Sequence, residues 1–166
     1  DFLPESHRAR DRFGTIFVRM IQAFVQFQDT DTGLWYQVLD RGGSEGNYTE
    51  ASASCMFVYA LAKGIRKGYL APKYLEAAES GYAGIIEHQV EVDECRQVNL
   101  TRICAVAGLG GEGQRDGSYE YYIGEPIVSN DQKGVGAFLL ASIEIERLEG
   151  TNMNPIDLRQ SPRRYL

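Results

Sequence analysis

Hydrophobic residues along this chain fall into two kinds of segment that alternate. Residues 10–28 carry apolar side chains at helical spacing and polar side chains on the opposite side, which predicts an amphipathic helix with one buried face. Residues 51–62 contain no charged residue, so the helix predicted there is enclosed by neighbours on every side. Residues 72–86 repeat the amphipathic pattern, and residues 134–143 repeat the charge-free one. The stripe expected to be buried in the first segment consists of Phe13, Ile16, Phe17, Met20, Ile21, Phe24 and Phe27.

This order predicts two hairpins, each made of an outer helix that faces solvent and an inner helix that is enclosed. Hairpins of this kind bury their apolar faces only against neighbouring hairpins, so at least three are generally needed for a stable unit. The sequence supplies two of them. We therefore expect an all-α fold that is completed by further helical hairpins or by self-association.

The composition is that of one globular domain. The chain has 166 residues, of which 43% are hydrophobic and 24% are charged, which argues against disorder. The net charge of −6 disfavours a nucleic-acid partner, because phosphate binding needs a basic face. No run of about 18 apolar residues is present, so no membrane partner is expected. The first residues lack the basic and apolar regions of a secretory signal, which leaves the compartment open with some preference for the cytoplasm.

Cysteine, histidine and glycine give no convincing signal for a metal or a cofactor. The three cysteines include no C-x-x-C pair, and the two histidines have no ligand partner at helical spacing. The segment Gly108-x-Gly110-x-x-Gly113 matches the letters of the dinucleotide-binding fingerprint. That fingerprint requires a helix after its last glycine, whereas residues 114–123 are predicted to be extended. We therefore expect neither a metal ion nor a nucleotide cofactor.

Two long loops rich in aromatic residues and glycine, residues 33–50 and 108–122, each precede an inner helix. Loops of this length in a compact domain are usually functional or disordered, and the aromatic content argues against disorder. Free N–H groups and the dipole at a helix N-terminus favour an anion such as a carboxylate, and the aromatic rings could stack on a sugar. The sequence thus predicts one shared ligand site, although residues 34–38 and 119–122 are also compatible with short half-buried strands.

Acidic residues in and after these loops are candidates for acid–base chemistry: Glu50, Asp116, Glu120 and Asp131. Two carboxyl groups that flank a glycosidic bond are the usual hydrolase arrangement, and spacing alone does not identify the pair. Glu50 and Asp131 are better interpreted as helix caps. Arg115 would hold Asp116 ionised if the two side chains touched, which suits substrate binding better than proton donation.

A series of longer motifs runs in order along the chain as far as about residue 148. The motifs are Thr32-Gly33-Leu34-Trp35-Tyr36-Gln37-Val38-Leu39-Asp40, Glu50-Ala51-Ser52-Ala53-Ser54, Met56-Phe57-Val58-Tyr59-Ala60-Leu61-Ala62-Lys63-Gly64, Gly108-Leu109-Gly110, Arg115-Asp116-Gly117-Ser118-Tyr119-Glu120-Tyr121-Tyr122 and Asn130-Asp131-Gln132-Lys133-Gly134-Val135-Gly136-Ala137-Phe138. Together they resemble the unsaturated rhamnogalacturonyl hydrolases, glycoside hydrolase family 105, which is related to the unsaturated glucuronyl hydrolases.

The resemblance implies an (α/α)6 barrel of six helical hairpins, with substrate at the N-terminal ends of the inner helices. Residues 1–148 would form the C-terminal portion of that barrel, and residues 149–166 would form a tail. The resemblance also implies removal of a Δ4,5-unsaturated galacturonic acid from pectin-derived oligosaccharides. In such enzymes an Asp is thought to protonate the C4=C5 double bond, water adds at C5, and no metal or organic cofactor takes part.

The family's principal catalytic Asp and its Arg-Gly-Asn-Gly-Trp-like motif have no counterpart in this sequence, so the resemblance assigns no proton donor here and implies that the isolated chain is inactive. It implies a substrate-lining role for Trp35, Tyr36, Arg115, Asp116, Ser118 and Tyr119. The expected partners are an oligosaccharide that contains an unsaturated uronic acid, linked to rhamnose or as a glucuronide, and either the missing N-terminal barrel portion or a second copy. The alternative is a non-catalytic carbohydrate-binding or self-associating helical module derived from such a barrel.

Overall fold

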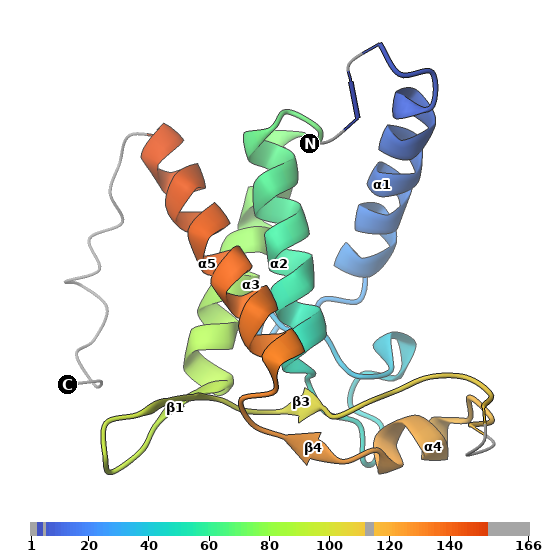
Figure 1. The fold of residues 1–166 in the computed structure, drawn as a ribbon, viewed down its shortest axis with the longest axis vertical. Coiled ribbons are helices and arrows are strands. Elements are labelled where there is room, and N and C mark those ends of the chain that lie inside the picture. Colours follow the sequence, from blue (N-terminus) through green and yellow to red (C-terminus); the bar gives the residue numbers. More distant parts are fainter. Residues whose placement is uncertain (1–2, 5, 112–114, 153–166) are drawn as a thin grey trace.

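The computed structural model describes residues 3–4, 6–111 and 115–152 of the chain. Four long helices dominate it (Figure 1): α1 (Arg10–Val25), α2 (Ala51–Arg66), α3 (Leu75–His88) and α5 (Gln132–Asn152). The shorter elements are the 3-10 turns η1 (Leu39–Arg41) and η2 (Pro72–Tyr74), the helix α4 (Tyr119–Gly124) and the strands β1 (Val90–Val92), β2 (Val98–Leu100), β3 (Ile103–Cys104) and β4 (Ile127–Val128).

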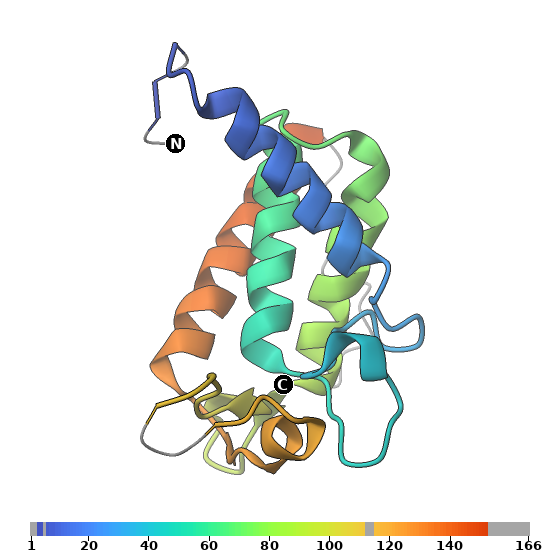
Figure 2. The same cartoon turned by 90° about the vertical axis from the view of Figure 1, so that its right-hand side faces the viewer.

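The long helices alternate in direction. Helices α2 and α5 run side by side and parallel, whereas α1 and α3 run the opposite way (Figures 1 and 2). Helix α2 is central, because it packs extensively against both α5 and α3. The predicted alternation is therefore confirmed, with α1 and α3 as the outer helices and α2 and α5 as the inner ones.

Two small antiparallel sheets lie at the N-terminal ends of the inner helices, in the lower part of Figure 1. In the first sheet Val90 of β1 lies opposite Leu100 of β2, and in the second Ile103 of β3 lies opposite Val128 of β4. These strands are short and belong to the connections between helices. They carry the chain from the end of α3 to the start of α5.

The hydrophobic core surrounds α2, and two glycines of α3 allow the first long loop to pack closely against that helix. A Cβ on Gly81 would meet the Trp35 ring, and a Cβ on Gly84 would meet the carbonyl oxygen of Thr32. These glycines therefore allow the start of the first long loop to lie directly against α3. The largest fully buried apolar side chains are Trp35, Ile21, Leu34, Leu61, Ile85, Ile103, Val58 and Cys55.

The expectation that α1 buries its whole apolar stripe is wrong. Ile21 and Phe24 are buried, but Phe13, Ile16 and Met20 are 55%, 50% and 47% exposed. The charge-free stretch of α5 is also uncovered on one side, with Leu139, Leu140 and Ile143 exposed. Both faces lie at the edges of the helical layer, where the described residues supply no neighbour. The apolar pattern therefore indicates packing that the described residues do not provide.

Two local expectations also differ from the structure. Residues 119–122 were expected to be extended, yet Tyr119–Gly124 is the helix α4, because the Ser118 side chain accepts a hydrogen bond from the Tyr121 N–H and caps it. Glu144, the first charged residue after the charge-free stretch 134–143, would be expected to face water, yet it is buried and accepts two hydrogen bonds from Arg66, at 2.7 and 2.9 Å. That ion pair links the two inner helices. Within the described residues, no helix is long and apolar enough to cross a bilayer.

Candidate functional site

The two long loops meet at the N-terminal ends of the inner helices, as the sequence predicts. The Tyr119 hydroxyl donates a hydrogen bond of 2.9 Å to the carbonyl oxygen of Glu45, which joins the second loop to the first. The Arg41 guanidinium lies 5.5 Å from the centre of the Tyr119 ring. Gly46 lies so close to Ile123 of α4 that a side chain there would meet it. The two segments therefore form one continuous loop region, which we call the loop end together with the adjoining residues 102–107 and 131–133.

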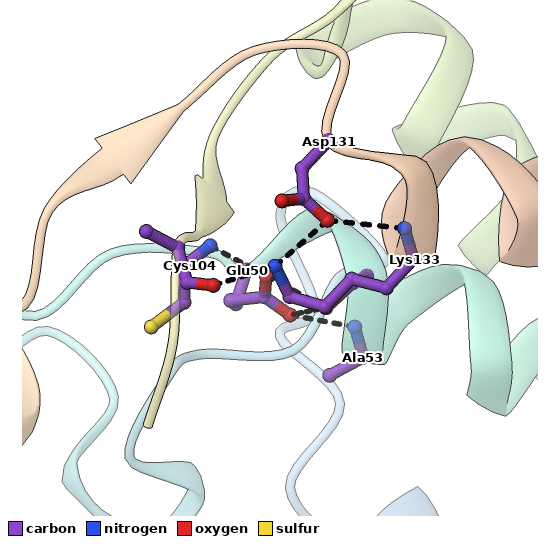
Figure 3. A network of polar contacts seen from close by, with 7 residues as sticks. Glu50, Ala53, Cys104, Asp131 and Lys133 are labelled. Carbon is purple, nitrogen blue, oxygen red and sulfur yellow. Dashed lines mark hydrogen bonds and ion pairs between the residues drawn. The ribbon is translucent and has the colours of Figure 1, made fainter.

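Glu50 is the best-connected carboxylate of the loop end (Figure 3). It is 2% exposed, and its carboxylate accepts hydrogen bonds from the Ala53 N–H at 2.6 Å and the Ser52 hydroxyl at 2.9 Å. The Cys104 N–H of β3 donates to the same carboxylate at 2.9 Å. The interpretation of Glu50 as the cap of α2 is confirmed, and the residue also ties β3 to that helix.

Most of the first N–H groups of α2 are consequently bonded within the chain. The Ala51 N–H donates to the carbonyl oxygen of Arg102 at 3.0 Å, and Ala53 and Ser54 donate to Glu50. The sequence predicted free N–H groups at this position that could bind an anion. The chain itself satisfies these donors, so the groups that remain for a ligand are side chains of the loops.

Asp131 and Lys133 make a second polar cluster at the start of α5 (Figure 3). Asp131 accepts a hydrogen bond from the Lys133 backbone N–H at 3.0 Å, and the Lys133 ammonium lies 2.9 Å from the same oxygen. These hydrogen bonds and the charge of Lys133 lower the pKa of Asp131. The Lys133 ammonium also donates to the carbonyl oxygen of Ala105 at 2.8 Å. Asp131 thus serves the helix start, as predicted, and Lys133 links α5 to the segment between β3 and the second loop.

Tyr36 lies half-buried beside Asp29. Burial raises the pKa of Tyr36, and the charge of Asp29 and a hydrogen bond to it raise it further. The Asp29 carboxylate accepts hydrogen bonds from the N–H and hydroxyl of Thr32 at 2.8 and 2.7 Å, which outweigh burial and lower its pKa. Arg102, with a left-handed φ of 60°, donates to the Thr49 carbonyl oxygen at 3.4 Å. A neutral phenol and a cation thus lie near each other at the loop end.

Asp116 is exposed, and its pKa is lowered by Ser118 and not by Arg115, the predicted contact. The Ser118 N–H donates to its carboxylate at 2.8 Å, and hydrogen bonding to Ser118 lowers its pKa. The predicted cause was a contact with Arg115, which instead lies along Gly108 and pairs its backbone with Gly110. Asp116 is therefore suited to accept hydrogen bonds from a ligand and unsuited to donate a proton.

Trp35 does not line a surface. It is 0% exposed, its indole N–H donates to the Phe24 carbonyl oxygen at 2.8 Å, and its ring meets those of Phe24 and Phe57 edge-on. Of the six residues predicted to line a substrate, the other five lie in the loop end at half-buried or exposed positions: Tyr36, Arg115, Asp116, Ser118 and Tyr119. Trp35 supports this region from the core.

Three cations of the loop end were missed by sequence reasoning. Arg41, Arg102 and Lys133 are exposed, and with Arg115 they lie among the carboxylates Asp40, Glu45, Asp116, Glu120 and Asp131 of the same region. A single exposed guanidinium of this kind can pair with a carboxylate ligand. Lys133 carried a usable signal, since it follows the cap Asp131 by two residues, whereas the left-handed turn at Arg102 has no sequence signature. Among the described residues no group of three or more potential ligands could hold a metal ion.

Comparison with known proteins gives a consistent family. Residues 1–149 match the family model described as Glycosyl Hydrolase Family 88. The chain is 46% identical over 132 residues to the "24.9 kDa protein in picA locus" of Rhizobium radiobacter, covering 76% of this chain and 57% of that protein. An Agrobacterium fabrum protein matches with the same identity and coverage. The chain therefore spans a little over half the length of these curated relatives.

Solved structures agree with the family model. The chain is similar to a glycoside hydrolase from family 105 of C. acetobutylicum, with a TM-score of 0.84 and 49% identity over 87% of this chain and 40% of that one. A possible family 105 member from Klebsiella pneumoniae has a TM-score of 0.70 and 28% identity, over 87% of this chain and 34% of that one. These neighbours agree with the prediction of a partial helical barrel. The chain therefore belongs to Glycosyl Hydrolase Family 88, within the group of related hydrolases of families 88 and 105 that its motifs resembled.

Proposed function

We propose that this chain is part of an unsaturated rhamnogalacturonyl hydrolase and supplies the substrate-lining loops of its barrel. The reaction removes a Δ4,5-unsaturated galacturonic acid from a pectin-derived oligosaccharide by hydration of the double bond. The observation that carries the proposal is that two aromatic loops, distant in sequence, join at the N-terminal ends of two parallel inner helices. Ligand sites of helical bundles and barrels are built where loops and helices converge in this way.

The charges of the loop end suit a uronic acid. The substrate carries a carboxylate, with which the exposed guanidinium of Arg41 or Arg102 can pair. The half-buried rings of Tyr36 and Tyr119 offer apolar faces against which a sugar ring can stack. The ionised Asp116 offers oxygens to sugar hydroxyls. Trp35 acts from the core by fixing the start of the first loop.

The principal acid of the reaction is expected outside this chain. Glu50 uses its carboxylate to accept hydrogen bonds from Ser52, Ala53 and Cys104, and Asp131 is paired with Lys133. Hydrogen bonds lower the pKa of Asp116, whereas a general acid at neutral pH needs a raised pKa. These carboxylates are therefore poor proton donors, and the chain contributes binding rather than protonation.

The test compares the chain with a fusion that places the uncovered part of the C. acetobutylicum enzyme in front of it. Hydrolysis of unsaturated galacturonosyl-rhamnose is followed by the loss of ultraviolet absorbance of the conjugated double bond. We expect negligible turnover by the chain and clear turnover by the fusion, with Tyr36→Ala raising KM roughly tenfold. The exposed Val98→Ala is the matched control, since β2 lies outside both loops.

Fast turnover by the isolated chain would contradict the assignment of the acid to another segment. An inactive but folded fusion would contradict the substrate assignment.

A second candidate is a non-catalytic carbohydrate-binding or self-associating module. The exposed apolar faces of α1 and α5 favour it, because large apolar patches seldom stay uncovered. Sugar binding without turnover by the fusion would favour this alternative.

A further inference from the structure

The cations of the loop end differ in whether their charged groups already have a partner. The Arg41 guanidinium lies 5.5 Å from the centre of an aromatic ring of the second loop. The Lys133 ammonium is paired with Asp131 at 2.9 Å, and the Arg115 side chain lies against the backbone of the second loop. Among the described residues Arg102 forms neither an ion pair nor a contact with the face of an aromatic ring. Its charge is therefore the one most available to a ligand.

The side chain of Arg102 is held at a single atom. Its Nε donates a hydrogen bond of 3.4 Å to the carbonyl oxygen of Thr49. The same oxygen accepts a hydrogen bond of 3.3 Å from the fully buried side chain of Gln89, so the anchor belongs to the core. The two terminal nitrogens of Arg102 have no hydrogen bond within the described part of the chain. A guanidinium whose terminal nitrogens are free in this way matches the two oxygens of a carboxylate.

The backbone fixes the position of this cation as well. Arg102 has a φ of 60°, in the left-handed region that residues other than glycine rarely adopt. Its carbonyl oxygen accepts a hydrogen bond of 3.0 Å from the N–H of Ala51, the first residue of α2. Backbone strain of this kind persists where the surroundings hold the residue in place, and it is frequent where a side chain contacts a ligand. The guanidinium is thus presented from a fixed point beside the start of an inner helix.

Two tyrosines of the first loop lie close to this guanidinium. Burial raises the pKa of Tyr36 and of Tyr48, and the positive charge of Arg102 opposes the rise at both. The charges of Asp29 and Asp31 also act on Tyr36, but neither carboxylate forms an ion pair with Arg102. Tyr36 is half-buried and belongs to the residues expected to line the substrate. A sugar that stacked on its ring would bring a carboxylate within reach of Arg102.

We propose that Arg102 binds the carboxylate of a uronic acid and makes the site selective for the free acid over its methyl ester. This inference rests on the proposed function, since it names the residue that recognises the charged group of that substrate. A methyl ester has no charge and lacks the second equivalent oxygen, so it forms weaker hydrogen bonds with a guanidinium. The site would therefore prefer oligosaccharides whose uronic acid is not esterified.

The test measures binding separately from turnover. Galacturonosyl-rhamnose without the double bond cannot be hydrated, so it and its methyl ester serve as the probes. Isothermal titration calorimetry gives the Kd of each probe for this chain, alone and in the fusion described above. We expect the acid to bind roughly tenfold more tightly than the ester. Arg102→Gly should raise the Kd of the acid roughly tenfold and change the Kd of the ester by less than about twofold.

Glycine is the chosen replacement because it removes the side chain and also suits the left-handed backbone. The Tm of Arg102→Gly should therefore rise or stay within about 2 °C of wild type. Arg96→Gly is the matched control, since Arg96 is exposed, has a φ of 63° and lies between β1 and β2, outside both loops. It should affect the Tm in the same way and leave both Kd values unchanged. Arg102→Lys keeps the charge without the planar group and should retain only part of the preference for the acid.

Each outcome decides the proposal. Loss of the preference for the acid in a folded Arg102→Gly, with the preference kept in Arg96→Gly, supports it. A preference that persists in Arg102→Gly, or wild-type protein that shows no preference either alone or in the fusion, overturns it. If Arg102→Gly does not fold, Arg102→Lys decides in its place, because an unchanged preference in that variant overturns the proposal and a reduced one supports it.

Hydrolysis of the unsaturated disaccharide by the wild-type fusion is followed separately. A fusion that hydrolyses it while the preference for the acid is independent of Arg102 overturns this inference and leaves the proposed function standing. A fusion that binds the acid through Arg102 without hydrolysing the unsaturated sugar contradicts the proposed function alone.

Discussion

The loop end and the apolar groove between α1 and α2 differ in whether their groups find partners among the described residues. At the loop end the first N–H groups of α2 are bonded to Glu50 and Arg102, and the two loops are joined by Tyr119 and Arg41. At the groove between α1 and α2, which Phe13, Phe17, Tyr59 and Gly64 line, the Phe13 side chain is 55% exposed. Most polar groups of the loop end are thus bonded among the described residues, whereas apolar side chains at the groove stay exposed.

This difference shows that polar loop contacts and apolar helix faces depend on different parts of a helical repeat architecture. Polar groups at a helix start are satisfied by residues nearby in sequence or in the next loop, so the loop end needs only this chain. Apolar faces in a repeat architecture are covered by the neighbouring repeat, so faces at the edge of the described helices stay exposed. Mutations at the loop end should therefore destabilise that region of the isolated chain locally. Mutations at the groove should lower stability only in an assembled barrel.

The largest effect in the isolated chain is expected at the ion pair between the inner helices. Glu144→Ala leaves Arg66 without its carboxylate at a partly buried position and should cost about 3 kcal/mol of unfolding free energy. Arg147→Ala, at the exposed partner 3.4 Å from Glu144, is the control and should cost less than about 1 kcal/mol. Denaturant unfolding followed by circular dichroism measures both.

The pH dependence of the stability lost in Glu144→Ala tests whether the contact between Glu144 and Arg66 is ionic. Burial raises the pKa of Glu144, but the hydrogen bonds and charge of Arg66 outweigh it, so the folded pKa lies below the ordinary value of 4.5. The stabilisation is therefore complete above that ordinary value and disappears as the pH falls through the lowered folded pKa. A difference between wild type and variant that stayed constant from neutral to strongly acid pH would contradict an ionic origin.

Removal of the Glu50 carboxylate should have the next largest effect. Glu50→Ala deletes the cap of α2 and the acceptor of the Cys104 N–H, and we expect a loss of about 2 kcal/mol. Glu87→Ala, on the exposed side of α3, provides a charge-matched control with little effect. Hydrogen exchange should localise the damage to the start of α2 and to β3. Uniform loss of protection over all four long helices would mean that Glu50 supports the whole fold and not the loop end alone.

The smallest effect is expected where the two loops join. Tyr119→Phe removes the hydroxyl that donates to Glu45 but keeps the ring beneath Arg41, so the loss of stability should be about 0.5–1 kcal/mol. The helices should be unaffected by circular dichroism, while limited proteolysis should cleave residues 41–46 faster. Tyr122→Phe, in the same short helix, is the control. An unchanged cleavage rate in Tyr119→Phe would show that the ring contact alone joins the loops.

Sequence reasoning predicted the long helices and the meeting of the loops because these depend on periodicity and repeat order. It failed where the outcome depended on a specific tertiary contact. Glu144 looks like a surface residue until Arg66 is placed 2.7 Å away. The sequence suggests that Trp35 stacks on a sugar ring, whereas the glycines of α3 leave room for Trp35 to be buried in the core. Residues 119–122 look extended, since three tyrosines favour strands, until the Ser118 cap closes a short helix.

The position of Trp35 gives this protein a built-in optical probe. It is the only tryptophan of the chain, and it is wedged between the end of α1 and the middle of α2. Its emission wavelength therefore reports the polarity of that one junction, undisturbed by any second indole. Detachment of α1 would expose Trp35 to water and shift its emission to longer wavelength before the other helices unfold. Tryptophan fluorescence can therefore follow the attachment of α1 without an added label.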